Sequence, residues 1–280
     1  MTQPFHFGKN WRAYLSGTDI REAAKTSAQF LERFLGRDLH GKTFVDAGCG
    51  SGLHSLAALM HGAVQVTSFD YDKDSVSCTE AIREKSSFGD HWKVTQGSLL
   101  DEAFMQSLQT FDVVYCWGVA HHTGDMWRAL ENLLRLAKPE GLVWIAIYNK
   151  AEGRFGSSWW RKVKYIYNAS PRPIQFIMEW LYIGLHFLLL ILHLKNPFTV
   201  IRRYESKRGM SWKTDLIDWL GGYPYEYASV AEIFSFFKKH GFTLENIQTT
   251  NYKGCNQFLF RAPLENAPPL AGRSLTGRAI

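Results

Sequence analysis

Short β-rich segments alternate with helical segments through the first half of this 280-residue chain. Runs of apolar and β-branched residues predict strands at 43–48, 65–72, 92–97, 111–118 and 142–149. Stretches with apolar residues at helical spacing lie between them and predict helices at 54–62, 74–85, 102–109 and 126–141. Strand–helix alternation of this kind is typical of a parallel sheet with right-handed crossovers.

The alternation stops after the fifth strand and resumes near the end of the chain. A helix is predicted at 229–241, and two further strands at 243–251 and 255–262. The link between these two strands is so short that they must pair antiparallel. We therefore expect an α/β fold with a doubly wound, mostly parallel seven-stranded sheet, an antiparallel last strand and a helical insertion.

The same pattern divides the chain into regions. Residues 41–150 and 229–263 form the predicted Rossmann-like core, and residues 1–40 read as an N-terminal helical lid. Residues 151–228, rich in aromatic and basic side chains, are the insertion and are expected to be a substrate cap. The Pro-, Gly- and Ser-rich tail, 264–280, is expected to be flexible.

Composition narrows the class of protein. With 46% apolar residues the chain has enough material for a sizeable core, which excludes disorder throughout. The four cysteines stand far apart without a C-x-x-C pair, and the segment MTQPFHFGKNW shows no apolar signal-peptide run. These features argue against a disulfide scaffold and a structural zinc site, and they predict a cytoplasmic protein without a metal.

The formal charge of +6 is unevenly distributed along the chain. Between Arg154 and Lys213 there are eleven basic residues and two acidic ones, so the rest of the chain is mildly acidic. This basic segment brackets the longest uncharged run, Trp180 to Leu194. Fifteen residues are too few to span a bilayer, which needs about twenty.

Two interpretations of this apolar segment remain. The favoured one makes 174–194 a buried or dimer-forming part of the cap. The other places it as a helix on an anionic membrane surface, anchored by its basic flanks within 154–213. Nucleic acid is a disfavoured partner, because no RNA-binding module is recognisable in the sequence.

A glycine-rich turn carries the strongest chemical signal. Gly48, Gly50 and Gly52 follow the first strand, where they allow positive φ and a close approach of a ligand to the backbone. The helix that follows presents unpaired N–H groups to that ligand. Asp70, at the end of the second strand, is placed to accept both hydroxyls of a ribose. The glycine spacing is not G-x-G-x-x-G, and Asp46 suits a ligand with a cationic head.

The stretch from Phe44 to Asn149 resembles the class I, Rossmann-like, S-adenosylmethionine-dependent methyltransferases. The residues that carry the resemblance are DAGCGSG at 46–52, FDYD at 69–72, FDVVYCWGVAHH at 111–122 and KPEG at 138–141. The sequence is most similar to the small-molecule and quinone-type members. Residues 151–228 lie outside the shared pattern.

The resemblance implies an S-adenosyl-L-methionine site. Its glycines, with Cys49 between them, would line the methionine part with Asp46 near the amino group, while Asp70 takes the ribose and Tyr71 lies against the adenine. Many members carry an aspartate where Ser98 stands, so Ser98, Asp101 or a backbone carbonyl must accept from the adenine amino group. The complete implied set is Asp46, Gly48, Cys49, Gly50, Gly52, Asp70, Tyr71, Gly97, Ser98, Leu99, Cys116 and Trp117.

Methyl transfer from a sulfonium is an in-line displacement that needs an aligned acceptor and, for some acceptors, a base. His121 and His122 follow the fourth strand at the ligand-binding edge of the sheet, and imidazole titrates near neutrality. They are the candidate catalytic residues, and the alternative is that they only cap the loop before Asp125. Candidate acceptor contacts are Trp11, Tyr14, Tyr148, Asn149, Tyr223 and Glu226. For the turn that carries Tyr223 and Glu226, simple aromatic packing is an equal alternative.

The sequence therefore predicts an enzyme that transfers a methyl group from S-adenosylmethionine to an O, N or S atom of a small or lipophilic acceptor. One alternative is a protein that binds the cofactor without turnover. The other is a membrane-surface methyltransferase of a lipid-like substrate, peripheral to the inner face of the membrane. The acceptor and the oligomeric state stay open.

Overall fold

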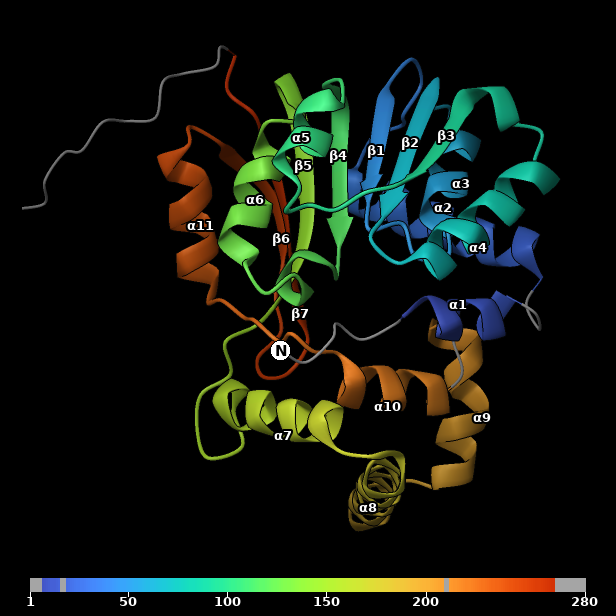
Figure 1. Cartoon of the computed structure of the whole chain (residues 1–280), viewed down its shortest axis with the longest axis vertical. Coiled ribbons are helices and arrows are strands. Elements are labelled where there is room, and N and C mark those ends of the chain that lie inside the picture. Colours follow the sequence, from blue (N-terminus) through green and yellow to red (C-terminus); the bar gives the residue numbers. More distant parts are fainter. Residues whose placement is uncertain (1–6, 16–18, 209–211, 265–280) are drawn as a thin grey trace, which may run out of the picture.

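A seven-stranded sheet forms the centre of the computed structural model, which describes residues 7–15, 19–208 and 212–264 (Figure 1). The strand order is β3-β2-β1-β4-β5-β7-β6, and only β7 runs antiparallel to its neighbours. The sheet confirms the predicted fold class. Its strands are β1 (Thr43–Ala47), β2 (Gln65–Asp70), β3 (Trp92–Gln96), β4 (Phe111–Trp117), β5 (Ala137–Tyr148), β6 (Thr243–Gln248) and β7 (Cys255–Arg261).

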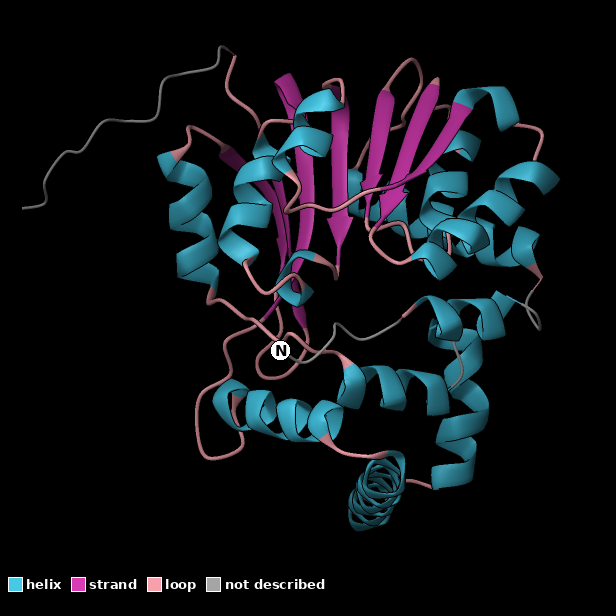
Figure 2. Cartoon of the chain, viewed as in Figure 1, coloured by secondary structure: helices cyan, strands magenta, loops and turns pink. Residues whose placement is uncertain are grey.

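Helices cover both faces of this sheet (Figure 2). One face packs against α2 (Ile20–Leu35), α3 (Leu53–Met60) and α4 (Lys73–Lys85). The other packs against α5 (Glu102–Ser107), α6 (Met126–Leu134) and α11 (Val230–Lys239). The apolar run of β5 is buried on both sides, as expected for a strand between two helical layers. Short 3₁₀ turns, η1 (Gly89–His91) and η2 (Ala120–His122), precede β3 and follow β4.

Side-chain caps fix where several of these helices begin. The Asp19 carboxylate accepts the N–H of Arg21 at the start of α2. At α11, Ser229 and Glu232 form a reciprocal capping box. Gly36 adopts a left-handed conformation (φ 65°) and ends α2, as a glycine after the last turn commonly does.

The helix predicted at 126–141 is shorter than expected. It ends at Leu134, because the chain then pairs with β4: the N–H of Phe111 donates to the carbonyl of Leu136 at 2.7 Å. The register shifts between Phe111 and Val113, and Glu140 takes a positive φ of 61°. Tertiary pairing therefore replaces the last predicted turn of helix with the start of β5.

The insertion folds into four helices beyond the carboxyl ends of the parallel strands (Figure 1). They are α7 (Ser157–Ala169), α8 (Arg172–Leu192), α9 (Pro197–Arg208) and α10 (Trp212–Gly221). Trp160, Tyr167, Leu216, Leu220 and Tyr225 form a small core of their own. The helix α1 (Gly8–Leu15) lies between this layer and α4.

The apolar helix of the insertion is not buried within the chain, which contradicts one half of the favoured prediction and leaves a dimer-forming role untested. It begins at Arg172, eight residues before the uncharged run, and so reaches 21 residues, enough by length and composition to cross a membrane. Only 6% of its most apolar window is buried within the chain. A buried helix in the cap is therefore wrong, because most of its apolar side chains face outward.

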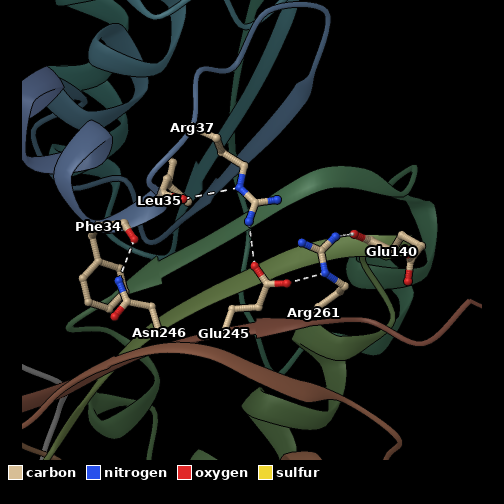
Figure 3. A network of polar contacts seen from close by, with 7 residues as sticks. All are labelled: Phe34, Leu35, Arg37, Glu140, Glu245, Asn246 and Arg261. Atoms are coloured by element: carbon tan, nitrogen blue, oxygen red, sulfur yellow. Dashed lines mark hydrogen bonds and ion pairs between the residues drawn. The ribbon is translucent and has the colours of Figure 1, made fainter.

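A polar network fastens the end of α2 to the far edge of the sheet (Figure 3). The Glu245 carboxylate of β6 accepts from Arg37, just after α2, at 2.7 Å, and also from Arg261 of β7. Beside it, the Asn246 amide donates to the carbonyl of Phe34 at 2.9 Å. The Arg261 hydrogen bond and the charges of Arg261 and Arg37 lower the pKa of Glu245, and they outweigh burial, which acts to raise it. This network therefore connects the end of α2 to the edge strand β6.

We expect Glu245→Gln to lower the free energy of unfolding by roughly 1 kcal/mol, a value discounted for the solvent around the site. The pKa is lowered in the folded state, so the stabilisation is present above the unfolded pKa of about 4.3 and is lost as pH falls through the folded value. Urea unfolding at neutral pH and at about pH 3 measures the difference. Glu131→Gln, at an exposed position of α6, is the control. An equal loss at both pH values would contradict this role for the network.

Candidate functional site

The glycine turn after β1 is built without room for side chains. Gly48, Gly50 and Gly52 have φ values of 85°, 54° and 81°. A Cβ on Gly48 would lie 2.4 Å from the side chain of Val119, and one on Gly50 would lie 2.8 Å from the indole nitrogen of Trp11. The N–H groups of Gly48 and Cys49 donate to the carbonyl of Phe69, so the turn is fixed to β2. The backbone therefore stays close to whatever occupies this edge of the sheet.

Asp70 stands at the end of β2, directly beside the turn. Its carboxylate accepts the N–H of Gly50 at 3.0 Å and that of Asp72 at 2.9 Å. Burial raises the pKa of Asp70 to about 6, and these backbone hydrogen bonds oppose the rise. A carboxylate has about four acceptor directions, so it can still take two hydroxyl donors. The residues present fit a bound nucleoside.

Asp46 lies deeper than Asp70. It is 2% exposed and accepts from the hydroxyl of Ser55, which in turn contacts Ser68 at 2.7 Å. Burial raises the pKa of Asp46 to about 7. Asp46 is thus hydrogen-bonded within a buried polar network below the turn, and its contact with a ligand amino group stays a prediction.

The residues expected around the adenine lie at the ends of β2 and β3. Tyr71, after β2, is 62% exposed. Cys49, in the glycine turn, is buried, and its sulfur accepts a hydrogen bond from Thr79. Ser98 uses its hydroxyl to accept the N–H of Leu100, and Asp101 caps α5 by accepting the N–H of Phe104. Both side chains thus accept a backbone N–H, and the group that would accept from an adenine amino group stays open.

Nearby, a glycine holds the close packing after β3. A Cβ on Gly97 would meet the ring of Phe104 at 2.2 Å. Leu99 is buried, and its carbonyl accepts from the side chain of Asn132 at 2.7 Å.

Cys116 and Trp117 end β4 on opposite faces of the sheet. The thiol of Cys116 is fully buried in the core, and burial raises its pKa to about 12. The indole of Trp117 donates to Gln257 and meets Phe30 of α2 edge-on. Only one of the two can therefore face a ligand above the glycine turn.

The histidine pair occupies η2, immediately after Val119. Nδ1 of His121 accepts the N–H of Tyr148 at 3.3 Å, and the two rings lie 4.0 Å apart. Nδ1 of His122 donates to the carbonyl of Pro224 at 2.7 Å. Within the described residues, Nε2 of His121 is buried without a hydrogen-bond partner.

Burial changes the chemistry expected of these histidines. Burial lowers the pKa of His122 to about 3 and holds the pKa of His121 well below its usual value, with the charge of Lys164 acting in the same direction. Both imidazoles are thus neutral near pH 7, unlike the titrating groups that the sequence suggested. Neutral imidazoles with such low pKa values are weak bases, and they are better suited to hydrogen bonding and packing.

A lysine and an aspartate that sequence reasoning missed lie beside the histidines. Lys164 of α7 is fully buried and donates to the carbonyl of Trp219. Asp218 of α10 accepts from the side chain of Asn10. Burial lowers the pKa of Lys164 to about 7 and raises that of Asp218 to about 7. The signal for Lys164 was its place on the Trp160–Tyr167 face of a helix, which is otherwise aromatic.

The short helix α1 contacts both the glycine turn and the region around Asp218. Its Asn10 reaches Asp218 in the cap, and Trp11 lies over Gly50 of the turn. The N–H of Gly8 donates to Asp72 at 3.0 Å, and Arg12 pairs with Asp74 at 2.7 Å. Trp11 thus lies against the glycine turn, and its predicted contact with an acceptor stays a prediction. Tyr14 belongs to α1, but its side chain lies outside the described part of the structure.

Three other expected acceptor contacts have structural partners. Asn149 donates to the carbonyls of Thr250 and Tyr252, and the Glu226 carboxylate accepts the N–H of Met126. Tyr223 packs on Tyr165, where it helps to line an outward-facing depression of about 310 Å³. Tyr148, the last residue of β5, contacts both histidine rings, His121 at a tilt and His122 edge-on.

Across residues 7–15, 19–208 and 212–264, no group of three His, Cys, Asp or Glu side chains is placed to hold a metal ion. The chemistry available at this edge of the sheet therefore comes from carboxylates, neutral imidazoles, a buried amine and backbone amides.

Comparisons with known proteins agree with this geometry. The family described as a methyltransferase domain matches residues 45–143. The ubiquinone biosynthesis O-methyltransferase of Coxiella burnetii is 29% identical over 112 residues, which are 40% of this chain and 46% of that protein. The ribosomal protein L11 methyltransferase of Haemophilus ducreyi is 32% identical over 116 residues, 41% of this chain and 37% of that protein. The chain thus matches less than half the length of these curated relatives.

Solved structures show the same fold over most of the chain. The magnesium protoporphyrin IX methyltransferase of Synechocystis superposes with a TM-score of 0.51 at 17% identity, covering 91% of this chain and 93% of that one. The cyclase SpnF superposes at 0.53 with 12% identity, covering 89% and 86%. Similarity at this level shows the fold alone, because enzymes of different reaction types share it.

Residues 45–143 thus match a methyltransferase domain, and the sheet and helices around them have the fold of a solved methyltransferase.

Proposed function

We propose that the protein transfers a methyl group from S-adenosylmethionine to an oxygen, nitrogen or sulfur atom of a small or lipophilic acceptor. The observation that carries the proposal is the glycine turn with the Asp70 carboxylate beside it, facing a second polar cluster across Val119. The turn supplies a nucleoside site, and the cluster of His121, Tyr148 and Lys164 supplies an acceptor site. The names of the relatives support methyl transfer, and those of the ubiquinone enzymes support an O-methyl acceptor.

The chain's own residues supply positioning and exclusion of water. Asp70 would hold the ribose hydroxyls, and the backbone at Gly48 and Gly50 would border the methionine part. The bound cofactor supplies an electrophilic methyl on a sulfonium. Holding an acceptor in line with such a group is worth on the order of 7–11 kcal/mol. Trp11 and the cap keep water from the reacting atoms.

The direct test is incubation of the purified protein with S-adenosylmethionine labelled in its methyl group and with aqueous and lipid extracts. The expected outcome is label transferred to an extracted molecule. Tight cofactor binding without a labelled product in either extract would favour the alternative, a binding protein without turnover.

Asp70→Ala should weaken binding of S-adenosylhomocysteine by roughly 2–4 kcal/mol, because two hydrogen bonds to a charged group are lost. Isothermal titration calorimetry measures the change. Asp90→Ala, at an exposed position of η1, is the matched control and should bind as the wild type does. Unchanged affinity of the Asp70 variant would refute its role at the ribose.

The exposed side of α8 favours a membrane-surface location for this activity. Trp180, Leu181, Leu185, Leu188 and Leu192 are each more than half exposed. The opposite side packs on α7 and α10 and carries Glu179, which pairs with Arg172 at 2.6 Å and accepts from Tyr167. Because that side is held by protein, α8 cannot be surrounded by lipid, and we propose that it lies in the surface of an anionic membrane. A cytoplasmic protein would then work at the inner face, with a lipid-soluble acceptor.

Flotation with vesicles of phosphatidylglycerol and phosphatidylcholine tests this location. We expect the protein to float at low salt and to float less as salt screens its basic flanks. Leu181→Glu with Leu185→Glu should abolish flotation, whereas Val64→Glu, at an exposed apolar position on the opposite part of the fold, should not. Protein that stays at the bottom at low salt contradicts the proposal, and a dimer in light scattering would identify α8 as a contact between copies.

A further inference from the structure

We propose that Lys164 and Asp218 form an acceptor subsite for a flat molecule with an anionic oxygen group. Lys164 binds this group, and the negative charge of Asp218 weakens its binding. The proposal rests on the proposed function, because it places the acceptor beside the cofactor site. Neither residue belongs to the methyltransferase-domain match, which ends at residue 143. The insertion supplies both, on α7 and α10.

The surroundings of Lys164 are aromatic on several sides. Its Nζ lies 4.2 Å from the ring centre of Trp219, 4.9 Å from that of Tyr225 and 5.9 Å from that of Tyr148. Ring faces attract a cation but leave its N–H groups without acceptors. Among the described residues, the carbonyl of Trp219 is the oxygen that accepts from Nζ. An ammonium has three donors, so an oxygen ligand would complete its bonding.

Among the described residues, no carboxylate is hydrogen-bonded to the Lys164 ammonium. Asp218 favours the ammonium through space and not through a hydrogen bond, since its carboxylate is engaged by Asn10. Lys253, in the turn between β6 and β7, opposes the ammonium and lies 5.8 Å from the same Trp219 ring. The other titratable groups facing this region are His121, His122, Tyr148, Tyr225 and Cys255. An anion beside Lys164 is therefore drawn by two amines and repelled by one carboxylate.

The position of the subsite suits an acceptor of the cofactor's methyl group. The ring of Tyr148 contacts both Trp219 on the cap side and His121 on the sheet side. His121 follows Val119, which touches the glycine turn. A planar acceptor lying along Tyr148 would have its anionic group at Lys164 and its other end toward the turn. Lys164 is fully buried, and Asn10 of α1 contacts the neighbouring Asp218.

The experiment measures benzoate binding to the protein saturated with S-adenosylhomocysteine, using calorimetry at about pH 6, where a carboxylate probe is ionised. Benzamide, which has the same shape and no charge, is the matched probe. We expect benzoate to bind at least about tenfold more tightly than benzamide, the discrimination given by one charge-assisted hydrogen bond. Lys164→Met should remove the preference and Lys164→Arg should keep it. Between pH 7 and pH 8, where Asp218 becomes ionised, Asp218→Asn should strengthen benzoate binding relative to the wild type, which loss of a merely structural residue would not do.

The pH dependence gives a second readout that needs no variant. Burial lowers the pKa of Lys164 to about 7, so the amine loses its charge as pH rises through that value. Benzoate affinity of the wild type should fall from pH 6 to pH 8, while benzamide affinity stays level.

Three results would overturn the subsite: no binding of benzoate to the wild type, equal binding of both probes, or an undiminished preference in Lys164→Met. Each counts only with normal binding of S-adenosylhomocysteine, which shows that the cofactor site is intact. Loss of S-adenosylhomocysteine binding in the wild type itself would instead refute the proposed function, and the subsite with it.

Discussion

The contact between Val119 and the bare backbone of Gly48 is the constraint on which the site depends. It brings the loop after β4 down onto the turn after β1, closer than any side chain on the glycine would allow. The turn and Asp70 lie on one side of this contact, and η2 with its histidines follows directly on the other. Two regions from separate crossovers of the sheet thus become one site, at the edge where ligands bind in open α/β folds.

Burial then sets the chemistry on both sides. Asp70, Asp46, Asp218 and Lys164 all have pKa values moved toward neutrality, and the histidine pair is held neutral. Such a concentration of desolvated ionisable groups weakens a fold, since each charge is taken out of water with incomplete compensation. Groups of this kind gather at functional sites, where ligands provide the missing partners.

The core could be predicted from the sequence because its signals are local. The β-rich runs, the glycine turn and the short link before β7 each fix a feature within a few residues, and strand–helix alternation predicts the mostly parallel sheet. The end of α6 could not be predicted, because pairing of Phe111 with Ala137 is a long-range event. The exposure of α8 could not be predicted from the sequence either, because an apolar composition is the same whether the helix is buried or faces outward. Lys164 and Asn10 could be recognised as site residues only from the structure, which places α7 and α1 at the carboxyl edge of the sheet.

A crystal structure grown with S-adenosylhomocysteine tests the central claim most directly. The account predicts the ribose hydroxyls on the Asp70 carboxylate, the homocysteine chain along the backbone of Gly48 and Gly50, and the sulfur directed toward Tyr148 and Lys164. A nucleoside bound at another place, or a turn that Trp11 continues to cover with no nucleoside beside Asp70, would contradict it.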